Sequence, residues 1–168
     1  TDKFLDHQPG PTHPECPERL QVMLNELRKS GFLEAGACEL IEPRRATREE
    51  LGLVHDERYV GWVEEFCARG GGLMDLGDTV ASPGSYEAAV RAAGAAIQAV
   101  ELVLEGHYDA AWALVRPPGH HAGRDYARGF CIFNNVAIAA QYLLEKRGLK
   151  RVAIIDIDCL LYTSDAAD

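Results

Sequence analysis

The 168-residue sequence predicts an α/β fold with a parallel sheet flanked by helices. Two wholly apolar runs, 110–115 and 152–155, have the composition of strands that are buried on both faces. Between them lies a helical pattern that Asn134 or Asn135 opens and Gly148 closes. A strand, a helix and a strand of these lengths form a βαβ unit, whose strands run parallel with a right-handed crossover.

The chain before this unit is predicted to be mainly helical. Residues 1–13 are polar and broken by proline and glycine, which indicates a loop. Pro17 fits the first turn of a helix that Gly31 ends. A short strand is expected at 40–42, and the small residues at 92–96 would let a long helix pack closely against the sheet. Further helices are expected to begin at the capping residues Thr47 (in a capping box with Glu50), Asp56 and Ser85.

The composition narrows the class of protein. A net charge of −9 argues against direct binding to nucleic acid or to an anionic membrane. No apolar run approaches the roughly 20 residues of a membrane span, and no secretory signal is visible. The five cysteines are odd in number and contain no Cys-x-x-Cys, so neither a disulfide framework nor a thiolate zinc site is indicated. We therefore expect a cytoplasmic location with no membrane partner.

Titratable side chains follow both predicted strands. His120 and His121 come directly after Arg-Pro-Pro-Gly, and Asp156 and Asp158 end the second strand. Because ligands in parallel α/β sheets bind beyond the carboxyl ends of the strands, we expect these four side chains to converge. We expect the two carboxylates to point to opposite faces, so that one could bind a divalent metal while the other orients a histidine.

Each pattern also has a less specific interpretation. A lone histidine pair is usually structural, and we expect His7, His13 and Glu15 to have surface or capping roles and His55 a structural one. An Asp-x-Asp after an apolar strand also begins phosphoryl-transfer sites such as those of haloacid-dehalogenase-like phosphatases. That motif normally starts a domain, however, and it leaves the histidines unexplained. A non-catalytic acyl-binding module is a third alternative.

Five segments carry a family resemblance: 13–20, 54–60, 116–122, 129–137 and 151–158. Together they resemble the histone deacetylase family, and their sequences are most similar to its class II-like branch of bacterial deacetylases and acetylpolyamine amidohydrolases. The resemblance implies an arginase-deacetylase fold, which is a parallel sheet flanked by helices. It also implies a zinc-dependent amidohydrolase that acts on an acetyl amide of a protein lysine or of a polyamine. The runner-up is an acetylpolyamine amidohydrolase, whereas the motifs of arginase-type manganese enzymes are missing.

The same resemblance assigns roles near the metal. Asp158 would be a zinc ligand. His121 would be the general base that takes a proton from the attacking water, and His120 would be its electrostatic partner, hydrogen-bonded to Asp156. Asp156, with the backbone of Asp158, would also form a monovalent-cation site, usually for potassium.

Three more residues receive roles by the same match. The carbonyl of Gly129 would accept the substrate amide, and Phe130 would line the tunnel for the acyl chain. Arg19 resembles the residue beside an internal channel through which acetate leaves. These assignments come from the family pattern and not from spacing or composition.

The sequence departs from the family after Asp158. The family continues with Val-His-His-Gly, whose first histidine is the second zinc ligand, but no histidine occurs in 159–168. A third ligand and an oxyanion-stabilising tyrosine, which lie further on in the family, are also missing. We therefore expect a domain truncated after the Asp-x-Asp strand, with 1–158 as its N-terminal part. Residues 159–168 resemble adapter read-through, a sequence artefact, and the chain by itself should be inactive.

Overall fold

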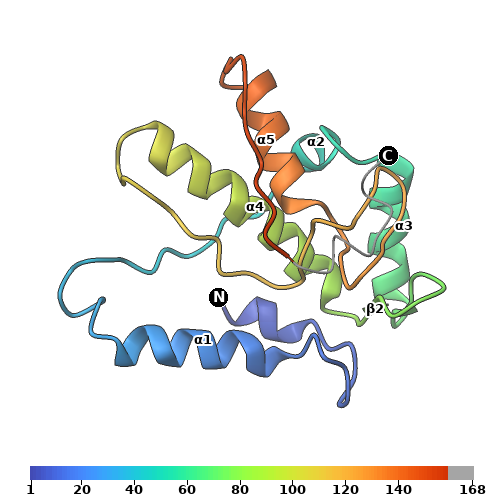
Figure 1. The fold of residues 1–168 in the computed structure, drawn as a ribbon. Coiled ribbons are helices and arrows are strands. Elements are labelled where there is room, and N and C mark those ends of the chain that lie inside the picture. The colour runs from blue at the N-terminus through green and yellow to red at the C-terminus, as the bar shows by residue number, and fades with distance from the viewer. Residues whose placement is uncertain (159–168) are drawn as a thin grey trace.

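The structure, a computed structural model, describes residues 1–158. In Figure 1, α4 runs through the middle of the molecule, α5 crosses it, α3 lies at one side, and α1 lies beneath with the N-terminal segment. No helix within 1–158 combines the length and the apolar character needed to cross a membrane. The elements are η1 (Asp2–Asp6), α1 (Pro17–Lys29), α2 (Arg48–Leu51), α3 (Glu57–Ala68), β1 (Gly72–Leu73), β2 (Val80–Ala81), α4 (Ser85–Leu104) and α5 (Asn135–Glu145).

Three of the four predicted N-cap residues cap their helices in the structure. The Thr47 capping box is present, and Asp56 accepts a hydrogen bond from the backbone of Arg58. The Asn134 side chain accepts from the amide of Ala137 at 3.1 Å. The prediction for Ser85 is wrong, because Gly84 is the N-cap of α4. The Ser85 hydroxyl instead accepts from the amide of Ser82 at 2.7 Å.

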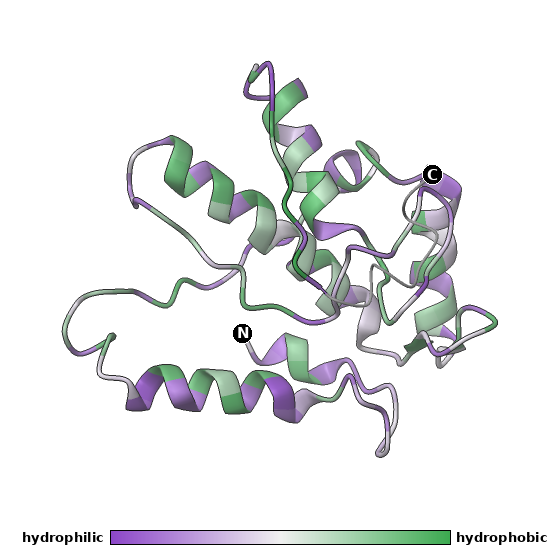
Figure 2. Ribbon diagram, in the orientation of Figure 1, coloured by the Kyte–Doolittle hydropathy of each residue, from purple (hydrophilic) through white to green (hydrophobic). Residues whose placement is uncertain are grey.

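The hydrophobic core lies where α3, α4 and α5 meet. Tyr59, Val60, Val63 and Cys67 of α3 face this core, and Figure 2 shows hydrophobic residues along α5 and the inner part of α4. Burying each large apolar side chain contributes about 1.5–3 kcal/mol. A smaller cluster joins η1, α1 and α4 through Phe4, Leu20, Ala88 and Ala92. The largest buried side chains of the main core are Leu51, Val60, Val63, Val90, Ile97, Ile132, Phe133 and Ile138.

The small residues of α4 permit a close approach, but not to a sheet. A Cβ on Gly94 would lie 2.2 Å from the carbonyl oxygen of Arg44 and 2.6 Å from the amide of Ala46. The amide of Ala46 in turn donates to the carbonyl of Val90. The expected sheet contact is therefore replaced by a contact with the connecting segment 44–46.

Gly94→Ala is expected to lower the free energy of unfolding by about 1–3 kcal/mol, because the new methyl group meets rigid backbone. Gly61→Ala is the matched control, since a Cβ at this α3 position has nothing within 4 Å. Alanine there should stabilise by about 0.5–1 kcal/mol through helix propensity. Urea denaturation of both variants provides the measurement. Equal effects of the two changes would contradict the packing argument.

The predicted parallel strands are not formed within residues 1–158. The runs 110–115 and 152–155 are extended but belong to no ladder, and neither does 40–42. The sheet of the described residues is a single antiparallel pair, in which Gly72 faces Ala81 and Leu73 faces Val80. A strand exists only through hydrogen bonds to a neighbour, and no described backbone pairs with either run. The prediction of two parallel strands buried on both faces is therefore wrong for the described residues, in which both runs are extended but largely exposed.

A buried polar cluster joins the N-terminal loop to the end of the run 110–115. The Arg116 guanidinium donates to both carboxylate oxygens of Glu15 at 2.5 and 2.8 Å, and to the carbonyl oxygens of Phe4 and His7. His7 Nε2 lies 3.1 Å from Glu15, and its Nδ1 lies 2.6 Å from the Ser85 hydroxyl. Surface or capping roles for His7 and Glu15 are therefore wrong, since both are almost fully buried.

This cluster makes folding sensitive to acid. Burial opposes ionisation of Glu15, but hydrogen bonds from His7 and Arg116 outweigh it and lower the pKa to about 2. A lowered carboxyl pKa contributes stability above the ordinary value of 4.5, and this contribution is lost as pH falls from about 4.5 to about 2. We expect Glu15 to contribute about 3 kcal/mol across that window. The titration of its side-chain carbon, followed by NMR, should have a midpoint near 2; a midpoint near 4 would contradict the pairing.

Candidate functional site

The histidine loop is held against the start of α5. A Cβ on Gly119 would lie 2.5 Å from the amide of Asn135, so only glycine allows this approach. The Asn134 side chain donates to the carbonyl of Ala122 at 3.1 Å and to that of His120 at 3.5 Å. The residue that caps α5 therefore also fixes the loop that carries the histidines.

His55 also helps to hold the histidine loop against the start of α5. Its Nε2 accepts from the amide of Asn134 at 2.9 Å, and its Nδ1 faces the carbonyl of Arg124 at 3.4 Å. Burial lowers the pKa of His55, which keeps the ring neutral and able to accept at Nε2. His55 thus has the structural role that the sequence predicts.

Asp156 and Asp158 both lie against the ring of His120. His120 Nδ1 lies 2.9 Å from Asp156 Oδ2, and its Nε2 lies 3.5 Å from Asp158 Oδ2. The expectation that the carboxylates point to opposite faces is wrong, because residues two apart in an extended segment lie on the same side. The expected convergence of all four side chains is nevertheless observed.

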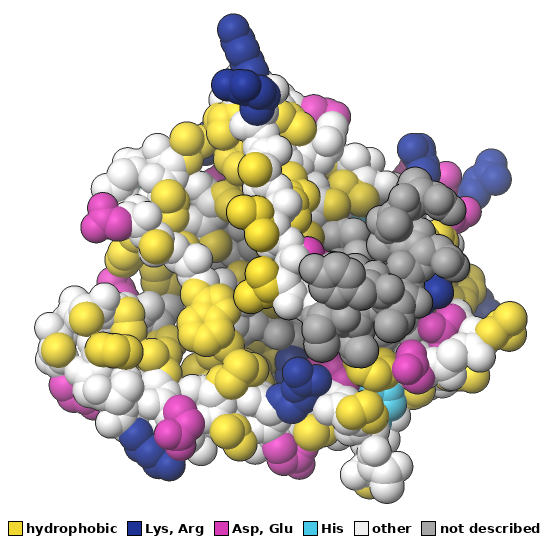
Figure 3. Space-filling model, viewed as in Figure 1, with side chains coloured by type: hydrophobic (Ala, Val, Ile, Leu, Met, Phe, Trp, Pro, Cys, Tyr) yellow, Lys and Arg dark blue, Asp and Glu magenta, His cyan; other side chains and the backbone are white. Residues whose placement is uncertain are grey.

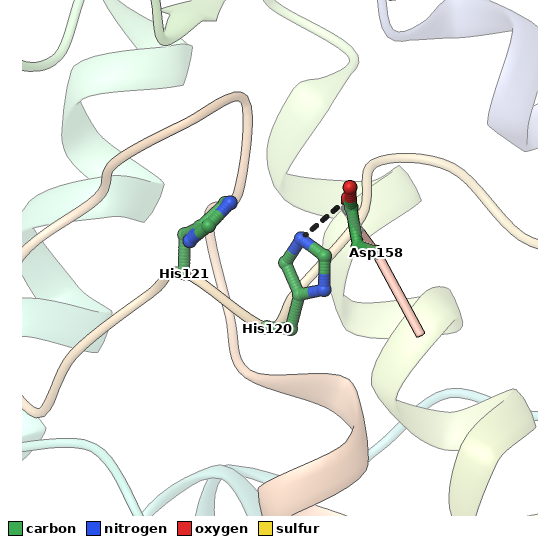
Figure 4. A group of neighbouring side chains, drawn as sticks. All are labelled: His120, His121 and Asp158. Carbon is green, nitrogen blue, oxygen red and sulfur yellow. Dashed lines mark ion pairs between the residues drawn. The ribbon is translucent and has the colours of Figure 1, made fainter. Parts of the chain in front are cut away.

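His120, His121 and Asp158 form a group that could hold a metal ion. One candidate ligand atom from each lies within 4.8 Å of the others. Figure 4 shows the His120 ring between Asp158 and His121, with both histidines on one loop and the carboxylate on a separate segment. Nitrogen and carboxylate donors in this number fit a borderline divalent ion such as zinc. The donor set is thus compatible with the predicted metal.

The environment of His121 favours its neutral form. Burial lowers the pKa of His121, and the neighbouring charge of His120 lowers it further, against the opposing effect of Asp158. The two rings are 4.2 Å apart between centroids. A neutral imidazole can accept a proton, which is the requirement for a general base.

Gly129 and Phe130 lie beside His121. Gly129 has φ +56°, and a Cβ there would lie 2.7 Å from Cδ2 of His121. Phe130 also has a left-handed conformation, with φ +67°; its amide donates to the Thr79 hydroxyl at 3.1 Å. Its ring meets His13 edge-on at 4.7 Å. The proposed substrate residues therefore border the histidine cluster and contact the β1–β2 hairpin region.

Arg19 is not brought to this cluster. It lies in the first turns of α1 with an exposed side chain, and no hydrogen bond or ion pair of the described residues joins it to the histidines. The buried arginine near the histidine loop is instead Arg116. Neither an internal channel nor a role for Arg19 follows from its position in 1–158.

Sequence reasoning missed the residues that support the site. Asn134 carries a capping signal, but nothing local indicates its hydrogen bonds to the histidine loop. Thr79 and His13 contact Phe130 across long sequence separations, so no short motif could reveal them. Arg116 offered one signal, a charged residue directly after an apolar run, but its partner Glu15 lies 101 positions away.

The site combines a histidine pair, one member of which is oriented by a carboxylate, with a second carboxylate that could hold a metal. This class of site suits metal-assisted hydrolysis. The sequence profile of the histone deacetylase domain matches residues 13–159. The chain therefore belongs to the histone deacetylase family, and the resemblance found in its motifs is confirmed.

Individual relatives agree with this assignment. A probable deacetylase of Archaeoglobus fulgidus is 41% identical over 157 residues, which are 94% of this chain and 43% of that protein. The human polyamine deacetylase HDAC10 is 44% identical over 154 residues, 86% of this chain and 23% of its own length. The crystal structure of the HDA15 HD domain superposes with a TM-score of 0.80 at 34% identity, over 88% of this chain and 42% of that one. The chain thus spans less than half the length of these proteins.

Proposed function

We propose that this chain carries the proton-handling part of a zinc-dependent deacetylase that hydrolyses acetyl amides of lysine or of another amine. The observation that supports it most strongly is the position of His120, 2.9 Å from Asp156 and 3.5 Å from Asp158. A histidine with a carboxylate at Nδ1 presents Nε2 in a defined tautomer and orientation. Membership of the histone deacetylase family also supports this proposal.

Each site residue of the chain has a separate role in the proposed reaction. Asp156 accepts the Nδ1–H of His120 and stabilises positive charge on that ring. His121, whose pKa is lowered by burial, takes a proton from water. Asp158 would hold zinc, which when bound polarises the amide carbonyl and lowers the pKa of water. The Gly129 carbonyl would accept the substrate N–H, and Phe130 would flank the acyl chain.

The assignment of a potassium site and that of an acetate channel belong to the same proposal. Asp156 Oδ1 accepts from the amide of Asp158 at 3.0 Å. Asp156 with the backbone of Asp158 would form the proposed monovalent-cation site, usually for potassium. An acetate-release role for Arg19 rests on the family pattern alone. The cytoplasmic location also stays a prediction.

The substrate class has two candidates. The relatives include proteins named histone deacetylase and proteins named polyamine deacetylase, so acetyl-lysine proteins and acetylated polyamines both suit the proposal. Comparing hydrolysis of an acetyl-lysine peptide with that of acetylspermidine distinguishes them. Family membership leaves the phosphatase alternative without support, and a non-catalytic acyl-binding module would bind acetyl-lysine without turnover.

Asp158→Ala is expected to weaken zinc binding by the chain by at least about 10–100-fold, the range known for outer partners of a ligand, because it removes the one side chain that is proposed to hold zinc. Competition with a chromophoric chelator measures this. Asp78→Ala is the control, since Asp78 is an exposed aspartate of the β1–β2 loop whose backbone carbonyl, not its carboxylate, contacts His13. We also expect no turnover by the 168-residue chain alone. Unchanged zinc affinity in Asp158→Ala, or clear turnover by the chain, would contradict the proposal.

A further inference from the structure

Gly129 and Phe130 form the tip of a tight turn. Arg128 and Cys131 exchange both of their backbone hydrogen bonds across it, at 3.1 and 2.9 Å. Both tip residues have a positive φ, +56° and +67°, which is the pattern of a type I′ turn. Glycine suits this conformation, whereas the Cβ of a phenylalanine is crowded in it. Phe130 is the one non-glycine residue with a positive φ among residues 1–158, so contacts from elsewhere must hold it there.

The hydroxyl of Thr79 supplies one of these contacts. Thr79 is fully buried at the end of the β1–β2 loop, and its Oγ1 accepts from the amide of Phe130 at 3.1 Å. The same hydroxyl donates to Asp75 Oδ2 at 2.7 Å, because an ionised carboxylate can only accept. The Asp75 carboxylate therefore fixes the direction of the hydroxyl hydrogen and leaves an oxygen lone pair for Phe130.

The side chain of Asp75 is itself fixed by the β1–β2 loop. Its Oδ1 accepts from the amides of Gly77 and Thr79, both at 3.0 Å. One carboxylate oxygen thus closes the loop, while the other orients the Thr79 hydroxyl. The loop thereby holds a residue that lies 51 positions further along the chain.

The ring of Phe130 is held from a second side by His13. The two rings meet edge-on, with 4.7 Å between their centroids. His13 Nε2 donates to the carbonyl of Asp78 at 2.8 Å, and its Nδ1 accepts from the amide of Glu15 at 3.1 Å. Histidine, hydrophobic and acidic side chains gather where the N-terminal loop meets the β1–β2 hairpin (Figure 3). The hairpin therefore contacts the Phe130 amide directly and its ring through His13.

We propose that Asp75 and Thr79 are positioning residues, which act through the amide of Phe130 to place one wall of the acyl-chain site. This inference rests on the proposed function, in which Phe130 flanks the acyl chain of the substrate. Within residues 1–158, no hydrogen bond or ion pair joins either residue to the histidine pair. Loss of the hydroxyl should therefore weaken substrate binding more than it slows the chemical step.

Amide hydrogen exchange of the 168-residue chain, followed by NMR, tests the hold on Phe130 without any need for activity. Thr79→Val keeps the shape of the side chain but removes the acceptor, so the Phe130 amide should exchange about 3–10-fold faster. Thr79→Ser keeps the hydroxyl and should stay within about 2-fold of the wild type. The amide of Ala137, which donates to Asn134, is the internal reference and should change in neither variant. Equal exchange of the Phe130 amide in the two variants would overturn the proposal.

Asp75→Asn tests the direction of the hydroxyl, and it replaces Thr79→Val if that variant does not fold. The asparagine oxygen can still accept from the two loop amides, but its NH₂ group donates where Oδ2 accepted. The hydroxyl then loses its acceptor, and the Phe130 amide should exchange at least about 3-fold faster. Adding Asp75→Asn to Thr79→Val should have no further effect, because Asp75 acts through the hydroxyl. Additive effects of the two changes would contradict this order.

A chimera in which residues 1–158 replace the matching part of the Archaeoglobus fulgidus relative measures the effect on the substrate. With an acetyl-lysine peptide, Thr79→Val is expected to raise KM about 3–10-fold and to leave kcat within about 2-fold, whereas Thr79→Ser restores KM. Leu76→Ala is the control, since Leu76 is fully exposed on the same loop and should change neither constant.

The two variants and the wild type separate the possible failures. An unchanged KM in Thr79→Val, or equal impairment in Thr79→Ser, overturns the positioning role while the proposed function stands. A wild-type chimera that folds, binds zinc and lacks turnover counts instead against the proposed function, and the exchange rates still decide whether Thr79 holds Phe130.

Discussion

Arg116→Met is expected to lower the free energy of unfolding by about 3–5 kcal/mol, the largest stability effect that we predict for a single residue. The substitution removes the guanidinium that donates to both oxygens of Glu15 and leaves that carboxylate buried without its main partner. It also removes the donors to the carbonyl oxygens of Phe4 and His7, which tie the N-terminal loop to the histidine loop. Urea denaturation followed by circular dichroism measures the change.

Lys29→Met is the matched control for this prediction. Lys29 forms an ion pair with Glu26 at 2.7 Å, but both side chains are largely exposed, so its loss should cost less than about 1 kcal/mol. If Arg116→Met does not fold, Glu15→Gln together with Arg116→Met should recover part of the stability, because no charge is then left unpaired. Equal effects of Arg116→Met and Lys29→Met would show that the buried pair does not anchor the loop.

His121→Ala is expected to reduce deacetylation about 10²–10⁴-fold, the range that a positioned general base contributes. Because the chain spans 43% of the Archaeoglobus fulgidus relative, the measurement uses a chimera in which residues 1–158 replace the matching part of that protein. Hydrolysis of an acetyl-lysine peptide and of acetylspermidine is then followed under steady-state conditions. The loss should appear mainly in kcat, since His121 is proposed to act on water and not to bind the amine.

His107→Ala controls for the loss of a histidine as such. His107 is exposed and lies near Glu105, beyond the end of α4, so the chimera carrying this change should keep its activity. Zinc content and the unfolding midpoint should be the same in both variants. A His121→Ala chimera with unimpaired turnover would remove His121 from the mechanism, whereas a wild-type chimera that folds, binds zinc and lacks activity would count against the proposed function itself.

Local sequence predicted the helices because their signals are local. A capping box at Thr47, a cap at Asp56 and another at Asn134 each depend on residues within three or four positions. Ser85 failed as a cap because its hydroxyl is taken by Ser82 and by His7, a residue 78 positions away. The two apolar runs showed strand composition, but a ladder requires a second segment, and none pairs with them within 1–158.

The sequence by itself determined the family and the residue types of the site, since the motifs around His120, His121 and Asp158 are short and continuous. Only the tertiary structure decided that Asp156 and Asp158 meet the same histidine ring, and that Glu15 and Arg116 form a buried pair. The physical reason is that contacts between distant segments depend on how the helices pack, which spacing along the chain does not encode. Burial then changes the chemistry of these groups, as the lowered pKa of Glu15 illustrates.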